Sequence, residues 1–322
     1  MVKSGQFSHI TGYFTMSAEL ESAIKERLSR LTKSRTGTSV PKACALTAGC
    51  PKCTNHKGVR LDVGTATLVA SLCDCVEACG VCGGSCLKPD DSKSGVGPCG
   101  TPSPRKIVGI INEAHIPSRY YEADLTKFDG FNLADRSQKT TIMNWLKALQ
   151  PGKSSGLLLS GPVGMGKSWL LAALAKHLAF QGFSVRYADF FQLVHELREA
   201  YANDLADKSS LRPLQNVDVL IIDELGKGRN TEWELSVADS LISDRYNGNK
   251  CIIAATNYPL RSSASDQNQR QIDYLRTDQS QTNQMNSNTF EPLSQRIGSR
   301  MFSRLTENCI CMEVSGPDRR RR

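Results

Sequence analysis

The sequence predicts an α/β fold, with a parallel sheet flanked by helices and a small cysteine-rich module preceding it. Three observations support this prediction. From Lys106 onward, short apolar runs alternate with helical stretches, as in a parallel sheet buried on both faces. A glycine-rich loop joins the first of these runs to the helix after it. Nine of the twelve cysteines fall between Cys44 and Cys99.

The bulk properties are those of a globular protein with room for one large domain and one smaller module in 322 residues. No run approaches the length of a membrane span, and Met1–Ser17 lacks the apolar core of a secretion signal. We therefore expect a cytoplasmic protein with no membrane partner. The net charge of +8 is compatible with a polyanionic partner, and Arg319–Arg322 supplies half of it.

Composition divides the chain into three parts. Residues 1–42 contain an amphipathic helical pattern over Ser17–Leu31 and a polar linker. Residues 43–104 form the cysteine-rich module, which ends in a Gly- and Pro-punctuated linker at Gly95–Pro104. Residues 105–322 form the α/β domain.

The spacing of apolar residues predicts the helices and strands of this domain. The predicted strands are continuous apolar runs, and the second helix is apolar nearly all round, which predicts burial. The Gln-, Ser- and Asn-rich segment 261–290 is expected to be a long surface loop or insertion. The predicted helices are Gln138–Leu149, Trp169–Phe180, Asp189–Tyr201 and Glu232–Arg245, and the predicted strands are Leu157–Leu159, Ser184–Ala188, Val217–Ile222 and Cys251–Ala255.

The glycine-rich loop fits the phosphate-binding pattern G-x-x-x-x-G-K-[ST] between a strand and a helix. Glycines allow backbone N–H groups to surround phosphate oxygens, and the helix N-terminus adds positive potential. The lysine would reach the β- and γ-phosphates, and the serine hydroxyl would bind Mg²⁺. We therefore expect ATP and Mg²⁺ as ligands. The loop consists of Gly161, Pro162, Val163, Gly164, Met165, Gly166, Lys167 and Ser168.

Polar side chains close the next two buried strands. Asp223 is placed to hold Mg²⁺, and the adjacent Glu224 could polarise an attacking water as a general base. Asn257 follows the strand at 251–255 and could orient that water, although an Asn before Tyr258 could also simply form a turn.

Phosphoryl transfer also needs positive charge on the γ-phosphate, which an arginine from a neighbouring subunit can supply. Arg304 is the candidate and Arg300 a helper. Both could equally be ordinary surface arginines of a helix.

From Ala114 onward the chain resembles the DnaC/IstB-like branch of AAA+ ATPases, which comprises bacterial replicative helicase loaders and transposition helper ATPases. The resemblance implies that Asn257 is the first sensor, Arg304 the arginine finger, and Arg319 or Arg320 a second sensor. The matching segments are Ala114–Tyr120 with Phe128, the loop Gly161–Ser168, Asp223–Glu234, Ala254–Leu260, Arg296–Leu305 and Gly316–Arg319.

The same resemblance implies partners: a replicative helicase or a transposase, single-stranded DNA, and further copies of the chain. It associates the helix after the second strand with DNA contact, through Phe190, Phe191 and Arg198, although an apolar stripe of this kind is more often core. The segment after Pro259 is longer than is usual in this branch.

The cysteine pattern predicts a zinc ribbon. Cys50, Cys53, Cys73 and Cys75 frame two alternating runs that suit a hairpin, and four thiolates suit a structural Zn²⁺. Cys44 and His56 are alternative ligands, and an iron–sulfur cluster is a further alternative. A second set of four ligands is Cys79, Cys82, Cys86 and Cys99.

The leading interpretation is an ATP-dependent switch that remodels DNA complexes as a helicase loader. A transposase helper with the same ATPase is the nearest rival. A phosphotransferase with the same loop, and a zinc adaptor that binds nucleotide without hydrolysing it, are the more distant alternatives.

Overall fold

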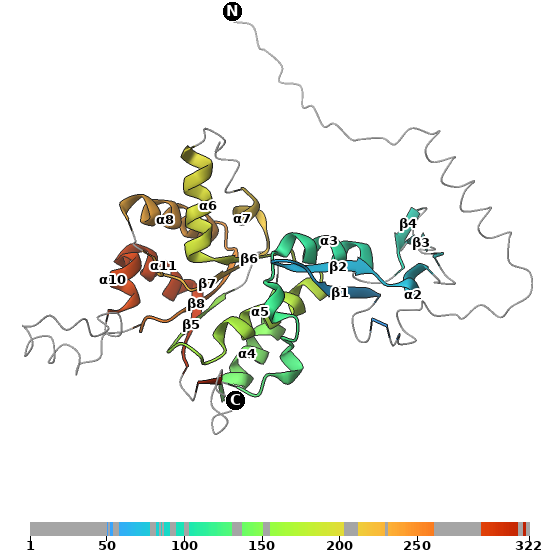
Figure 1. Cartoon of the computed structure of the whole chain (residues 1–322), viewed down its shortest axis with the longest axis horizontal. Helices are drawn as coiled ribbons and strands as arrows, with labels where there is room; N and C mark the ends of the chain where they lie inside the picture. Colours follow the sequence, from blue (N-terminus) through green and yellow to red (C-terminus); the bar gives the residue numbers. More distant parts are fainter. Residues whose placement is uncertain are drawn as a thin grey trace, which may run out of the picture.

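A five-stranded sheet forms the centre of the molecule (Figure 1). Every neighbouring pair of strands is parallel, so the carboxyl ends of all five strands meet at one edge. The predicted fold class, a parallel sheet flanked by helices, is confirmed. The strand order is β6 (Val185–Asp189), β7 (Val219–Asp223), β8 (Cys251–Thr256), β5 (Gly156–Ser160) and β9 (Cys309–Glu313).

The structure is a computed structural model. The predicted helix over Ser17–Leu31 and the polar segment 261–290 lie outside the residues it describes. The described residues are 50, 52–53, 58–77, 82–83, 85, 87–90, 95–99, 103–130, 137–150, 155–202, 212–228, 231–260, 291–314 and 318–319.

The sheet separates two apolar cores, because successive side chains of a strand point to opposite faces. Leu157 and Leu159 face α4 (Ser137–Ala148) and α5 (Lys167–Phe180) in one core. Leu158 faces the other core. Helices α6 (Phe190–Ala202), α7 (Arg212–Asn216), α8 (Glu232–Asn247), α10 (Leu293–Ile297) and α11 (Ser299–Asn308) cover that second face (Figure 1).

The four helices and four strands predicted in the α/β domain are present with small shifts at their ends. Helix α5 is buried nearly all round, as its composition predicts. Strand β9 was not predicted. It is an edge strand with exposed residues at Ile310 and Cys311, so it lacks the continuous apolar run of β5, β7 and β8.

The predicted linker at Gly95–Pro104 is wrong. Strand β4 (Gly95–Pro98) pairs antiparallel with β3 (Leu87–Asp90), and Pro104 opens helix α3 (Pro104–Ala114). Proline suits the first turn of a helix, because the N–H that it lacks would have no partner there. Pro104 therefore marks a helix start, and the apolar spacing after it was a readable helix signal.

The predicted hairpin is confirmed: β1 (Val59–Val63) and β2 (Leu68–Leu72) pair antiparallel, and the short α2 (Asp74–Glu77) follows. Its buried face packs on α3, where Val59 and Leu61 share an apolar cluster with Ile107 and Ile111. The Asn112 side chain bonds both backbone groups of Ala70, accepting at 2.6 Å and donating at 3.1 Å.

The hairpin is also bonded to the segment that leads into the α/β domain. Leu68 N–H donates to Ile116 O at 2.8 Å, and Ser118 N–H donates to Ala66 O at 3.0 Å. Two short 3₁₀ turns, η2 (Ser118–Tyr120) and η3 (Leu125–Lys127), then carry the chain toward the sheet.

Candidate functional site

The glycine-rich loop leaves the carboxyl end of β5 and enters α5 at the edge where all strands end. Gly164 and Gly166 have φ of +88° and +92°, which glycine adopts without strain. The loop borders a cleft of about 370 Å³, within the usual size of small-molecule sites. Its lining is Tyr120, Lys127, Val163, Gly164, Met165, Gly166, Lys167, Ser168, Trp169, Asp223, Glu224, Ala255, Thr256, Asn257 and Arg319.

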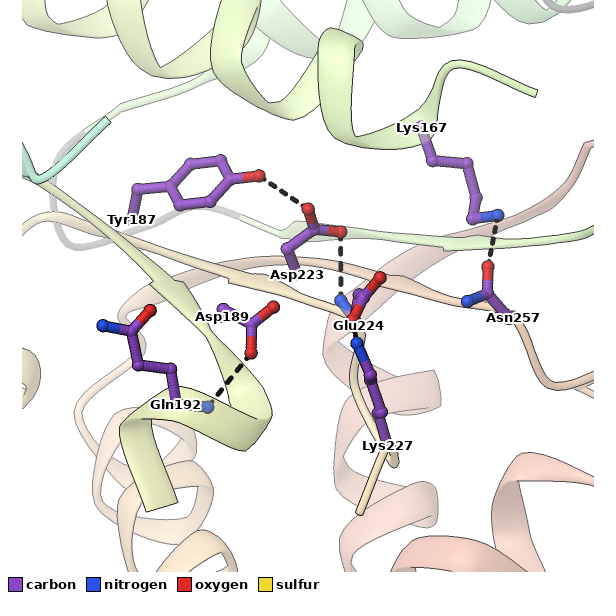
Figure 2. Close-up of polar contacts among 8 residues, drawn as sticks. All are labelled: Lys167, Tyr187, Asp189, Gln192, Asp223, Glu224, Lys227 and Asn257. Carbon is purple, nitrogen blue, oxygen red and sulfur yellow. Dashed lines mark hydrogen bonds and ion pairs between the residues drawn. The ribbon is translucent and has the colours of Figure 1, made fainter. Parts of the chain in front are cut away.

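Lys167 is held by oxygens at the end of the sheet. Its Nζ donates to Gly161 O at 2.6 Å and to Pro162 O at 2.7 Å. It also donates to Asn257 Oδ1 at 2.8 Å (Figure 2). The predicted phosphate ligand and the predicted sensor residue are therefore in direct contact. The ammonium is buried, so its charge acts in a medium that screens it weakly.

Asp223 ends β7 as a buried carboxylate with three hydrogen-bond donors. Tyr187 Oη donates to Oδ2 at 2.7 Å and Glu224 N–H to Oδ1 at 3.0 Å (Figure 2). The Ser168 hydroxyl also bonds this carboxylate. Burial raises the pKa of Asp223, and the bonds from Tyr187 and Ser168 partly offset that rise.

Ser168 and Asp223 together offer the oxygen ligands that Mg²⁺ prefers, so the residues present fit this ion. Tyr187 was not predicted as a site residue. It projects from β6, and its contact with Asp223 depends on β6 pairing with β7, which the sequence of β6 does not reveal. Burial, and next the Asp223 charge, raise the pKa of Tyr187, so the phenol keeps its proton as a donor.

Glu224 lies immediately past the strand in a left-handed conformation, with φ of +53°. Its carboxylate forms an ion pair with Lys227, three residues later (Figure 2). The hydrogen bond to Glu224 raises the pKa of Lys227, and the nearby charges of Glu224, Asp189 and Asp223 add to that rise. A non-glycine residue at positive φ is uncommon and is often found at functional positions.

Four thiols are brought together at the base of the β1–β2 hairpin, as predicted. The Sγ atoms of Cys50, Cys53, Cys73 and Cys75 all lie within 4.8 Å of one another. Two pairs are separated by 3.8 Å, Cys50 from Cys73 and Cys53 from Cys75. Sulfurs about 2.3 Å from a tetrahedral Zn²⁺ are about 3.8 Å apart, so this cluster fits zinc.

Comparison with known proteins gives a family. The model of the IstB-like ATP binding protein family matches residues 104–271, which is more than half of the chain. The chain belongs to the IstB-like ATP-binding protein family. ATP binding is therefore expected of this chain, and the glycine-rich loop that borders the cleft lies within the matched residues.

Relatives of this IstB-like chain fall into two groups. An insertion-sequence ATP-binding protein of Sinorhizobium fredii is 32% identical over 47% of this chain and 49% of its own length. The replicative helicase loader DnaC of Escherichia coli is 25% identical over 39% of this chain and 51% of its own length. The chain thus spans about half the length of these curated relatives.

Solved structures also resemble this chain. A crystal structure of the DnaC helicase loader aligns with a TM-score of 0.47 and 24% identity, covering 61% of this IstB-like chain and 99% of that chain.

Within the described residues, no helix of this IstB-like chain has both the length and the apolar character to span a bilayer.

The two candidate arginines of the IstB-like chain lie on α11 and are not among the described residues that line the cleft. Arg304 donates to Asp239 Oδ1 at 2.9 Å and to the Ser243 hydroxyl at 2.5 Å, and its side chain is 19% exposed. Arg300 is 74% exposed and lies 4.0 Å from Asp239.

Of the two candidates for the second sensor, only Arg319 is among the described residues. Arg319 lines the cleft, its N–H donates to Gly164 O at 2.9 Å, and its guanidinium donates to Gly130 O. Arg320 lies outside the described residues. Tyr120 and Lys127, which the motif analysis did not single out as site residues, also line the cleft.

Of the residues loosely associated with DNA contact, Phe190 is buried in the core. Phe191 is 49% exposed. Arg198 forms an ion pair with Glu234 at 3.1 Å and lies over the Trp233 ring.

The second set of cysteines is described only in part. Cys82 and Cys99 are both buried and in contact. Cys79 and Cys86 lie outside the described residues, as do the alternative ligands Cys44 and His56.

Proposed function

We propose that this chain hydrolyses ATP and uses the cycle as a switch on DNA, as a cytoplasmic loader of a replicative helicase. One observation carries the ATPase part: a phosphate-binding lysine, a buried carboxylate and a general-base candidate converge on one cleft. Lys167, Asp223, Glu224 and Asn257 all line it. A protein that only binds nucleotide needs neither Glu224 nor Asn257 there.

The proposed chemistry assigns a role to each of these side chains. The Lys167 ammonium leaves its carbonyl partners to bind the γ-phosphate. Ser168 and Asp223 would hold Mg²⁺, which would supply positive charge against the phosphates when bound. Glu224 accepts a proton from the attacking water as the water oxygen bonds to the γ-phosphorus, and the bond from that phosphorus to the bridging oxygen breaks to release ADP. Asn257 orients the attacking water.

We propose that a neighbouring subunit completes the site with an arginine. Resemblance assigns this role to Arg304, and Arg300 is its helper. The contacts within one subunit favour testing both, because Asp239 and Ser243 already bind Arg304, whereas Arg300 is the more exposed. Arg300→Ala and Arg304→Ala should each retain ATP binding, and the larger loss of hydrolysis identifies the finger.

The first test of the ATPase is Glu224→Gln. The amide cannot accept the proton, so hydrolysis should fall about 100-fold or more while ATP affinity stays within about twofold. Lys167→Ala should instead lose ATP binding. Hydrolysis at the parental rate in Glu224→Gln would remove Glu224 from the mechanism.

A second candidate function is supported by specific findings. The family match and the Sinorhizobium fredii relative favour a helper ATPase of a transposase, whereas the DnaC relative favours a helicase loader. Glu224→Gln protein held with ATP should be used as bait in host lysate, with Lys167→Ala as the matched control. Recovery of the replicative helicase supports the loader, and recovery of a transposase without helicase supports the rival.

We propose Zn²⁺ for the cluster Cys50, Cys53, Cys73 and Cys75, with a structural role. Four protein thiolates would leave no open position for catalysis. We propose further that residues 43–104 dock a partner or DNA. Metal analysis of the purified chain, and binding assays with and without this module, test the two parts separately.

A further inference from the structure

The turn that carries Glu224 is fastened to the sheet on one side. Leu225 N–H donates to Ala255 O at 2.8 Å, and the Thr256 hydroxyl donates to Leu225 O at 2.8 Å. Lys227 N–H closes the turn on Glu224 O at 3.0 Å. These bonds fix the start of the turn but leave the carbonyls of the two following glycines to find partners elsewhere.

Arg296 of α10 fastens the other side. Its Nε and Nη2 both donate to Gly226 O, at 3.1 and 3.0 Å, and Nη2 also donates to Gly228 O at 2.6 Å. The guanidinium lies over the Tyr258 ring, 5.0 Å from its centre, and 3.5 Å from the Glu291 carboxylate. The side chain is only 17% exposed.

The packing shows that this contact is close. Gly226 has φ of +86°, and a Cβ there would lie 3.2 Å from Leu293 Cδ1 and 3.5 Å from Arg296 Cβ. A side chain at this position would therefore push α10 away from the turn. Charge-assisted bonds of this kind are roughly twice as strong as neutral ones and have fixed directions.

We infer that Arg296 is a positioning residue for Glu224: it holds the turn 224–228 so that the Glu224 carboxylate borders the nucleotide cleft. This inference rests on the proposed function. Through Gly298, α10 continues into α11, which carries both Arg304, the proposed finger, and its helper Arg300. One helix pair thus orients the base of its own subunit and carries the arginine proposed to reach the next.

The alternative role for Arg296 is that of Arg300, a charge delivered to a neighbouring subunit. The contacts favour the internal role, because the guanidinium is occupied by the carbonyls of Gly226 and Gly228 and covered by Tyr258. The Arg296 guanidinium donates to backbone carbonyls of the turn. Removing this side chain should therefore loosen the turn without altering the phosphate loop.

Arg296→Gln tests the role directly. We expect kcat for ATP hydrolysis to fall about tenfold to 100-fold, with ATP affinity unchanged within about twofold. Arg296→Lys should recover part of kcat, because one ammonium can reach one carbonyl. Arg212→Gln, at an exposed arginine of α7, is the matched control and should keep the parental kcat. A loss of ATP affinity equal to the loss of kcat would overturn the inference.

Mixed assemblies separate the internal role from the neighbouring one. Arg296→Gln subunits mixed with Lys167→Ala subunits should stay impaired, because the defect lies in the subunit that binds ATP. Recovery of hydrolysis on mixing would overturn the inference and make Arg296 a residue that acts on the neighbouring subunit. Arg300→Ala mixed with Lys167→Ala should recover if Arg300 is the finger.

A readout without catalysis separates this inference from the proposed function. Hydrogen exchange at the Leu225 and Lys227 amides should be faster in Arg296→Gln than in the parent, and the same in Arg212→Gln as in the parent. Unchanged exchange in Arg296→Gln would overturn the inference. Absence of hydrolysis in the parent, with faster exchange in the variant, would reject the ATPase and keep the positioning role.

Discussion

At the scale of single residues, the cleft places an ionisable carboxylate where burial opposes its charge. Burial raises the pKa of Asp223, although Tyr187 and Ser168 donate to it. The folded state therefore holds the proton more tightly than the unfolded state does, and the ionised form costs stability above the folded-state pKa. The cost disappears as pH falls through that pKa. A buried ionised carboxylate of this kind lowers the free energy of unfolding, a cost that is common at functional sites.

Asp223→Asn is expected to stabilise the nucleotide-free protein by about 1 kcal/mol at neutral pH, because a neutral amide carries no charge to bury. The gain should shrink at acidic pH, where Asp223 is protonated. The same variant should lose the Mg²⁺ dependence of ATP binding. Thermal unfolding at several pH values, with Tyr187→Phe as a comparison, measures the effect. A lower melting temperature for Asp223→Asn at neutral pH would contradict it.

At this scale, the sequence predicted the site residues that follow the buried strands. Lys167, Asp223 and Asn257 reach one cleft because each follows a buried strand and parallel strands end at the same edge. Tyr187 and Arg296 were not predicted as site residues. Their roles depend on strand pairing and on helix docking, which come from tertiary contacts and leave no periodic signal along the chain.

At the scale of elements, one buried arginine joins α7, α8 and β8. Arg245 of α8 is fully buried, and its guanidinium donates to backbone carbonyls. It donates to Leu214 O at 2.8 Å, Val217 O at 3.0 Å, Asp218 O at 3.1 Å and Cys251 O at 2.6 Å. Several buried carbonyls depend on this one side chain.

Arg245→Met is expected to lower the free energy of unfolding by about 3 to 5 kcal/mol, because buried carbonyls lose their donors. Arg198→Met, at a half-exposed arginine, should cost less than about 1 kcal/mol. Urea unfolding of both variants provides the comparison. Equal losses in the two variants would show that the buried bonds do not carry the stability of this corner.

The cluster of Cys50, Cys53, Cys73 and Cys75 is a second case at the scale of elements. Backbone amides of Cys53 and Lys52 lower the pKa of Cys50 to about 7, whereas burial raises the pKa of Cys53 and of Cys75. Zinc binds thiolates, so binding must release protons from the thiols that are still protonated. Lower pH therefore opposes binding.

Zinc affinity is expected to rise with pH between about 6.5 and 8.5, by about tenfold per pH unit for each thiol that must ionise. Competition with a chromophoric chelator measures it. Cys73→Ser should bind zinc more weakly and speed hydrogen exchange in β1 and β2, whereas Cys311→Ser, at an exposed cysteine of β9, should change neither. An affinity independent of pH would argue against thiolate ligation.

At the scale of the whole molecule, the cleft and the proposed finger are on different parts of one subunit. Arg304, the proposed finger, and its helper Arg300 both lie on α11 and are not among the described residues of the cleft. The parallel sheet with flanking helices was predicted from the alternation of apolar runs with helical stretches, whereas the strand order and the two cores come from the structure. Strand β9 and helix α10 were not predicted, because both are short and partly exposed. Their place beside β5 and the Glu224 turn comes from long-range packing.

Hydrolysis per subunit is expected to rise with protein concentration, because a site shared between subunits forms only in the assembly. The rise should follow mass action and level off once assembly is complete. ATPase rates over about a hundredfold range of concentration, with sedimentation at the same concentrations, test this. A rate per subunit that stays constant while the protein dissociates would show that one subunit contains the whole site.

The bonding of the hairpin to α3 decides where the chain can be cut. A truncated protein starting at residue 104 would uncover Ile107 and Ile111 and leave Asn112 without its partners on Ala70. It would expose fresh apolar surface and invite aggregation. A shortened protein for biochemistry should therefore begin ahead of Cys50 and be purified in the presence of zinc, the metal proposed for the cysteine cluster. Loss of activity in a shorter fragment would then report damage to α3 as much as the absence of a docking module.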